Sequence, residues 1–87
     1  MANLNVQQRK ASKEQTKIRV LAVAKILNEG RKMRICDIQR LLELNYGIKA
    51  AHDTVMHDVW AVDRFIPIEV TMGKGGGYQK MNLLLED

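Results

Sequence analysis

The side chains that most often bind metals or carry out catalysis are few in this sequence, and their spacing is unfavourable. His52 and His57 are five residues apart, so on a helix they point about 140° away from each other. This differs from the i, i+4 spacing that places two histidines on one metal ion. Cys36 is the single cysteine of the 87 residues, which excludes an internal disulfide and a zinc site with several thiolates. No nucleophile has a base placed beside it by its spacing, so we expect no metal, no cofactor and no enzymatic activity.

A glycine-rich segment, residues 73–77, raises the question of a phosphate-binding loop. Its order, Gly-Lys-Gly-Gly-Gly, fits neither the spacing of nucleotide-binding P-loops nor that of the dinucleotide fingerprint. It also follows a strand pattern and opens no helix. We therefore interpret it as the turn of a β-hairpin in which glycines supply positive φ angles. Lys74 would lie at the tip of this turn, where it could contact a DNA backbone phosphate.

Positive charge is concentrated in the first 35 residues. This part carries nine Lys and Arg against two Glu, or +7, and residues 36–87 carry five against eight acidic side chains, or −3, which together give the net +4. A polyanion would prefer the basic part, because electrostatic attraction follows local charge. The alternative is that these side chains only keep a helical surface soluble. The nine cations are Arg9, Lys10, Lys13, Lys17, Arg19, Lys25, Arg31, Lys32 and Arg34.

Apolar residues at helical spacing predict three helices, at about residues 14–28, 37–45 and 51–64. Ile18, Leu21 and Ile26 lie beside the apolar stripe of the first helix. They indicate that a second side of this helix is also covered, for example by a partner subunit. The stripes consist of Val20, Val23, Ala24 and Leu27 in the first helix, Ile38, Leu41 and Leu42 in the second, and Ala51, Val55, Val59 and Val62 in the third. The core is expected to form between Val55, Val59 and Val62 on one side and Leu27, Leu41 and Leu42 on the other.

Three further side chains are expected to be structural. Trp60 and Tyr78 should pack against a neighbouring helix or the hairpin rather than stack on bases, because a large aromatic in a small domain usually joins the core. Asp58 borders the core stripe of the third helix. We expect it to cap or brace a neighbouring element rather than to contact nucleic acid.

The hydrophobic period changes to two after Phe65, which predicts a strand at residues 66–71. Pro67 fits the start of an edge strand, because it cannot donate to a ladder. The chain returns in a second strand from Tyr78 to about Leu83, and residues 32–35 alternate as a short strand of their own. Residues 1–13 show no sustained period and are interpreted as a flexible basic arm, followed by one domain at residues 14–87.

The segment Thr54-Val55-Met56-His57-Asp58-Val59, followed by Pro67-Ile68 and Gly76-Gly77-Tyr78, resembles the DNA-binding domain of DeoR-type and WYL-domain bacterial transcriptional regulators. The resemblance covers about residues 18–80 and implies an α+β winged helix-turn-helix fold, with three helices and a C-terminal β-hairpin wing. It also implies a stand-alone relative that lacks the effector domain of the family. One departure concerns the third helix, where His52, Asp53, Met56 and His57 occupy positions at which the family carries arginine.

The implied function is that of a small bacterial or phage transcriptional regulator that binds double-stranded DNA. Bidentate contacts from arginine to guanine are not available within the third helix, so base contacts are expected from Thr54 and His57. Contacts to the DNA backbone are expected from Arg31, Lys32, Arg34, Lys49, Lys74 and Lys80.

A second interpretation is that the third helix binds another protein, as in an adaptor or an antirepressor-like module that does not bind DNA itself. The face of that helix is nearly neutral and carries Trp60, which favours this alternative. A homodimer could form through the apolar side chains of the first helix that lie beside its core stripe, or through Leu83–Leu85. No segment resembles a signal peptide or a membrane span, so a cytoplasmic protein without a membrane partner is expected.

If the basic arm follows DNA phosphates, deletion of residues 1–13 should lower the salt dependence of DNA binding. The deletion removes Arg9, Lys10 and Lys13, and each neutralised phosphate contributes ~0.9 to the slope of log affinity against log salt. Full engagement would therefore lower the slope by ~2.7 in magnitude, measured by fluorescence anisotropy in a salt series. An unchanged slope would show that the arm does not contact DNA.

Overall fold

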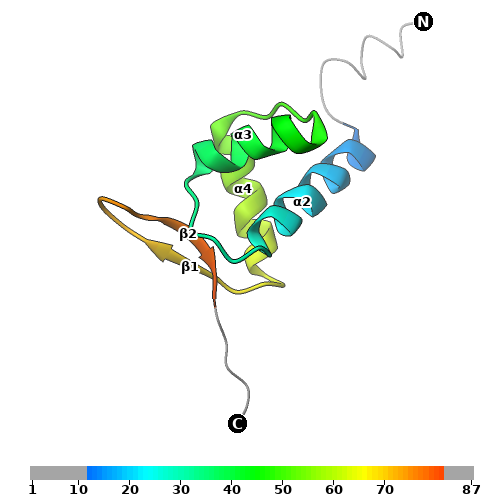
Figure 1. Cartoon of the computed structure of the whole chain (residues 1–87). Coiled ribbons are helices and arrows are strands. Elements are labelled where there is room, and N and C mark those ends of the chain that lie inside the picture. Colours follow the sequence, from blue (N-terminus) through cyan, green and yellow to red (C-terminus); the bar gives the residue numbers. More distant parts are fainter. Residues whose placement is uncertain (1–11, 82–87) are drawn as a thin grey trace, which may run out of the picture.

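Residues 12–81, the part of the chain that the computed structural model describes, form three helices and one two-stranded antiparallel sheet (Figure 1). The helices are α2 (Lys13–Leu27), α3 (Ile35–Tyr46) and α4 (His52–Asp63), and the strands are β1 (Ile68–Thr71) and β2 (Gly77–Lys80). The α+β class expected from the sequence is thus confirmed. The Leu83–Leu85 segment and residues 1–11 of the expected basic arm lie outside the described residues.

The first helix begins at Lys13, one residue before the expected start at about residue 14. Ser12 is the N-cap of α2, and its hydroxyl accepts a hydrogen bond from the Gln15 backbone N–H at 3.1 Å. The Gln15 side chain accepts one in return from the Ser12 N–H, also at 3.1 Å, which completes a capping box. Lys13 is therefore the first residue of the helix, and Ser12 caps it. A test of the arm that leaves α2 intact deletes residues 1–11 and removes two cations, Arg9 and Lys10, so the maximum change in slope becomes ~1.8.

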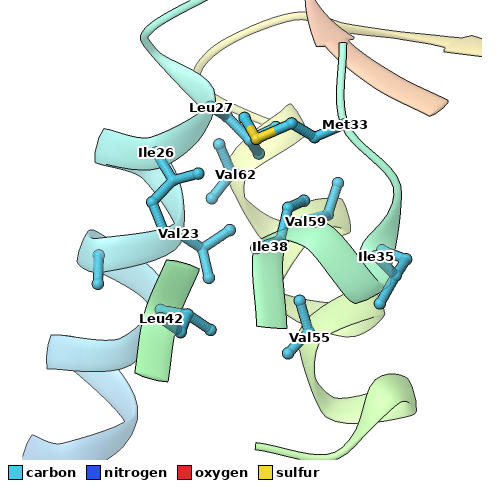
Figure 2. Packing of buried hydrophobic residues seen from close by; sticks show 11 residues of the cluster. Val23, Ile26, Leu27, Met33, Ile35, Ile38, Leu42, Val55, Val59 and Val62 are labelled. Carbon is cyan, nitrogen blue, oxygen red and sulfur yellow. The ribbon is translucent and has the colours of Figure 1, made fainter. Parts of the chain in front are cut away.

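The three helices surround one hydrophobic core (Figure 2), because each has an apolar stripe that must be buried against the others. Five of the six side chains expected to form its centre are buried, namely Leu27, Leu42, Val55, Val59 and Val62, whereas Leu41 is half-buried. Ile26, which the sequence pattern places beside the stripe, is 2% exposed and packs in the core. The segment between α2 and α3 adds Met33 and Ile35, so a linker also helps to close the core.

Two expectations about α4 are wrong. The sequence pattern places Ala51 on the apolar stripe, but it is the N-cap residue and is exposed, because the helix begins one residue later. Trp60 was expected to pack against a helix or the hairpin, yet it is 52% exposed. The core positions of this turn are taken by Val59 and Val62, and Trp60 lies outside their face.

A buried ion pair joins α2 to α4. Arg19 donates from Nε to Asp58 Oδ2 at 2.5 Å and from Nη2 to Oδ1 at 3.1 Å, which is a bidentate arrangement. Asp58 is the one buried charged residue in the described part of the chain, with its side chain 6% exposed, and the Arg19 side chain is 16% exposed. The hydrogen bond to Asp58 raises the pKa of Arg19 above its usual value, against the opposite effect of burial. Asp58 therefore braces a neighbouring helix, as the sequence predicts.

Backbone hydrogen bonds join the hairpin to the segment before α3 at one pair of residues, and three side-chain hydrogen bonds add to this attachment. Met33 N donates to Tyr78 O at 2.8 Å, and Tyr78 N donates to Met33 O at 2.6 Å. The strand expected at residues 32–35 is thus reduced to one bridge. β1 starts two residues later than expected, because the N–H of Ile66 still donates to Val62 O at the end of α4. In register, Val70 pairs with Tyr78 and Thr71 with Gly77.

Space for a side chain is lacking at Gly77. A Cβ at this position would lie 2.8 Å from the carbonyl oxygen of Met33 and 3.1 Å from Cγ of Lys32. Positive φ angles do occur in the turn, at Gly73 and Gly75, as the sequence predicts. A side chain at position 77 would therefore push the hairpin away from the segment that precedes α3.

Removal of the arginine of the buried pair should destabilise the domain. Arg19→Ala leaves Asp58 buried without a partner, and we expect it to lower the free energy of unfolding by about 3–5 kcal/mol, measured by urea denaturation. Replacement of both residues by apolar ones, Arg19→Met with Asp58→Leu, should recover much of this loss. Lys25→Ala on the exposed side of α2 is the control. A stability of Arg19→Ala within 1 kcal/mol of Lys25→Ala would contradict the role of the pair.

The close approach at Gly77 predicts a second stability effect. Gly77→Ala should destabilise the domain by about 1–3 kcal/mol, because the added methyl group must displace the backbone of Met33. Lys74→Ala in the exposed turn is the matched change that should leave the melting temperature unchanged. Equal melting temperatures for Gly77→Ala and wild type would show that the hairpin does not depend on this contact.

Candidate nucleic-acid interface

The outer face of α4 carries five exposed residues, His52, Asp53, His57, Trp60 and Asp63. The rings of His57 and Trp60 meet edge to face, with centroids 5.0 Å apart and an interplanar angle of 84°. This face follows from the burial of Val55, Asp58, Val59 and Val62 on the opposite side of the helix. It carries no lysine or arginine, because none occurs at positions 50–63.

The N-terminal ends of α3 and α4 open toward the hairpin. One hollow is lined by Arg34 and Ile35 from the start of α3, by His52 from the start of α4, and by hairpin residues at 70–73 and 76–78. Figure 1 shows these helix ends on the same side of the molecule as the tip of the hairpin. The hairpin thus lies beside the N-terminal ends of the two helices and forms one surface with them.

The N-terminal ends of α3 and α4 have no N-cap side chain that accepts from the helix, but at α3 the carboxylate of Asp37 accepts from the Arg34 N–H at 3.1 Å. Their N-cap residues are Arg34 and Ala51, and neither side chain has an oxygen that could accept from the first N–H groups of the helix. In α2, by contrast, Ser12 fills this role. The positive end of a helix dipole favours a phosphate at such an end, and at α3 the negative charge of Asp37 opposes it.

A second hollow lies between α3 and the turn that leads to α4. Arg40 and Lys49 line it together with Cys36, Gln39 and Glu43. Gln39 fixes the turn, because its Nε2 donates to the carbonyl oxygen of Ala50 at 2.9 Å. The two cations therefore come to one hollow from separate segments.

Arg40 also borders a third hollow, which contains Arg31, Lys32 and Asp37. We refer to the five cations around the N-terminal part of α3 as the α3 basic band. It consists of Arg31, Lys32, Arg34, Arg40 and Lys49.

Three carboxylates reduce the charge of this band. Asp37 and Glu43 line the same hollows, and Glu29 accepts a hydrogen bond from Arg31 Nη2 at 3.1 Å. Five cations minus three carboxylates leave +2. The band remains positive, and within residues 12–81 no carboxylate pairs with the exposed side chains of Arg34, Arg40 or Lys49.

The structure brings together only some of the residues expected to bind DNA. Arg31, Lys32, Arg34 and Lys49 lie around α3, and Lys74 is exposed in the hairpin turn. Lys80 is apart from them, at the base of the hairpin, where its Nζ donates to Oδ1 of Asn28 at 3.1 Å.

The two residues expected to contact bases differ in their accessibility. His57 is exposed beside Trp60, whereas Thr54 is half-buried. Thr54 lies one turn before Asp58, on the side of α4 that faces Arg19 of α2. Of the two, His57 is therefore the more accessible to a ligand.

Arg40 is a candidate that the sequence analysis did not select. A signal for it exists, since Cys36, Arg40 and Glu43 follow the i, i+4, i+7 spacing of one helix face and are all exposed. Its proximity to Lys49 has no such signal, because it depends on the path of the turn that Gln39 holds in place.

Comparison of the chain with protein-family models, curated proteins and solved structures finds no match. Among residues 12–81, no three His, Cys, Asp or Glu side chains gather into a group that could hold a metal ion. The same part of the chain contains no helix that is both long and apolar enough to cross a membrane.

Proposed function

We propose that this chain is a winged helix-turn-helix protein that binds double-stranded DNA. In this proposal α3 and α4 are the two crossed helices, and the β1–β2 hairpin is the wing. The observation that carries the proposal is the hollow shared by the N-terminal ends of α3 and α4 and by the hairpin. Arg34 lines this hollow and Lys74 is exposed in the adjoining hairpin turn, so two cations and two helix starts are available to the phosphates of a duplex.

The proposed contacts divide into two kinds. Phosphates are held by Arg34 and Lys49 at the helix starts and by Lys74 on the wing, and these contacts position the duplex without reading its sequence. His57 is the accessible side chain of α4 that can donate to or accept from a base edge. Lys80 has a smaller role than the sequence suggests, since it is engaged with Asn28.

The biological role in this proposal is that of a small transcriptional regulator, and it rests on the resemblance to DeoR-type and WYL-domain regulators. A homodimer would allow two half-sites to be bound at once. Ile18 and Leu21 support such contact, because they are 51% and 68% exposed on α2.

A second candidate function is the binding of a protein partner through α4. The exposed Trp60 beside His57 favours it, because a large aromatic side chain in a surface patch is a common anchor of protein interfaces. The absence of lysine and arginine from positions 50–63 favours it as well. In this case α4 would not enter a DNA groove.

The proposed role of the wing predicts that Lys74→Ala weakens DNA binding without a change in stability. Loss of one phosphate contact should lower the magnitude of the salt slope by ~0.9. The readout is fluorescence anisotropy with a labelled duplex of random sequence in a salt series. Lys25→Ala is the matched control, because it removes the same charge from an exposed position on α2.

The outcomes separate the two candidate functions. Equal slopes for Lys74→Ala and Lys25→Ala would remove the wing from the interface. If the wild-type chain shows no salt-dependent binding to any duplex, the proposal of DNA binding is wrong. Loss of a protein complex on Trp60→Ala would then favour the second candidate.

A further inference from the structure

The exposed cations and the side chain that could contact a base lie on different elements of this molecule. The cations surround α3, whereas His57 lies on α4. The α3 basic band surrounds the N-terminal part of α3, and its members occupy the margins of three neighbouring hollows. Arg34, Arg40 and Lys49 are all exposed there. They come from the start of α3, its middle and the turn before α4.

Arg40 holds the central position in this band. It borders both the hollow with Lys49 and the hollow with Arg31 and Lys32. Its guanidinium group can contact a phosphate through two donors at once, which a lysine cannot do with the same geometry. Because Arg40 is exposed and forms no hydrogen bond or ion pair in the described part of the chain, its charge is available to a ligand.

The exposed face of α4 has the opposite character. Asp53 is exposed, with 85% of its side chain accessible, and it would repel phosphates near a groove. His57 is packed edge to face against Trp60, and a wide indole ring occupies the next turn of the helix. Bidentate contacts to guanine, the commonest specific contacts in the major groove, need an arginine or lysine that this face does not have.

We propose that the α3 basic band holds the phosphodiester backbone of the duplex and supplies most of the binding free energy, so that affinity depends little on base sequence. This inference rests on the proposed function and extends it, since it assigns the dominant contact to Arg40 and its neighbours rather than to α4. The ligand class is the backbone of double-stranded DNA. Its recognition depends on the spacing of phosphates and not on base edges.

The experiment uses the full chain and fluorescence anisotropy. The variants are Arg40→Gln, which removes the charge, Arg40→Lys, which retains it, and Lys25→Gln as a matched control on α2. Arg40→Gln should lower the magnitude of the salt slope by ~0.9 for every duplex, which corresponds to about eightfold in affinity per tenfold change in salt. Arg40→Lys should retain the slope, and thermal melts should show that all variants are folded.

Sequence dependence is measured with the same chain on a pool of random duplexes, carried through rounds of selection. Affinities for unrelated duplexes should agree within about fivefold, whereas specific readers prefer their sites by roughly 10³ or more. Enrichment of one sequence motif bound about 100-fold more tightly than the unselected pool would overturn the inference, and so would equal slopes for Arg40→Gln and Lys25→Gln. Both results leave DNA binding itself intact. Absence of binding by the wild-type chain would instead overturn the proposed function.

Discussion

The bidentate pair between Arg19 and Asp58 constrains the whole arrangement, because it fixes the rotation of α4 against α2. A carboxylate that is removed from water must keep its partner, so α4 cannot turn without exposing Val55 and Val59 and separating the pair. The apolar core alone would tolerate some rotation, since hydrophobic contact is not directional. Fixed in this way, α4 presents His57 and its neighbours to solvent.

The remaining elements are placed relative to that core by a few directional contacts. Gln39 holds the turn after α3 through the carbonyl group of Ala50, and the bridge between Met33 and Tyr78 holds the hairpin beside the start of α3. The close approach at Gly77 leaves no space for a side chain between them. As a result, two helix starts and a glycine-rich turn meet on one side of the molecule, where the proposed ligand is an anionic duplex.

Much of the fold could be predicted from the sequence, because helices and strands leave a periodic signal. The bracing role of Asp58 was also predictable, since the residue borders an apolar stripe. The exposure of Trp60 was not, because size and hydrophobicity favour burial and only the rotation of α4 decides otherwise. The grouping of Arg40 with Lys49 depends on the path of a turn, which local sequence patterns do not determine. Whether these residues bind DNA stays a prediction.

The central claim is that a DNA duplex contacts the N-terminal parts of α3 and α4 together with the hairpin turn. Amide chemical shifts of the isotopically labelled full chain, recorded during titration with a random-sequence duplex, test it most directly. The largest changes should occur at residues 34–40, 49–53 and 73–76, with small changes along the exposed side of α2 near Leu21. Changes confined to that side of α2 or to the indole N–H of Trp60, or no changes at all, would contradict the account.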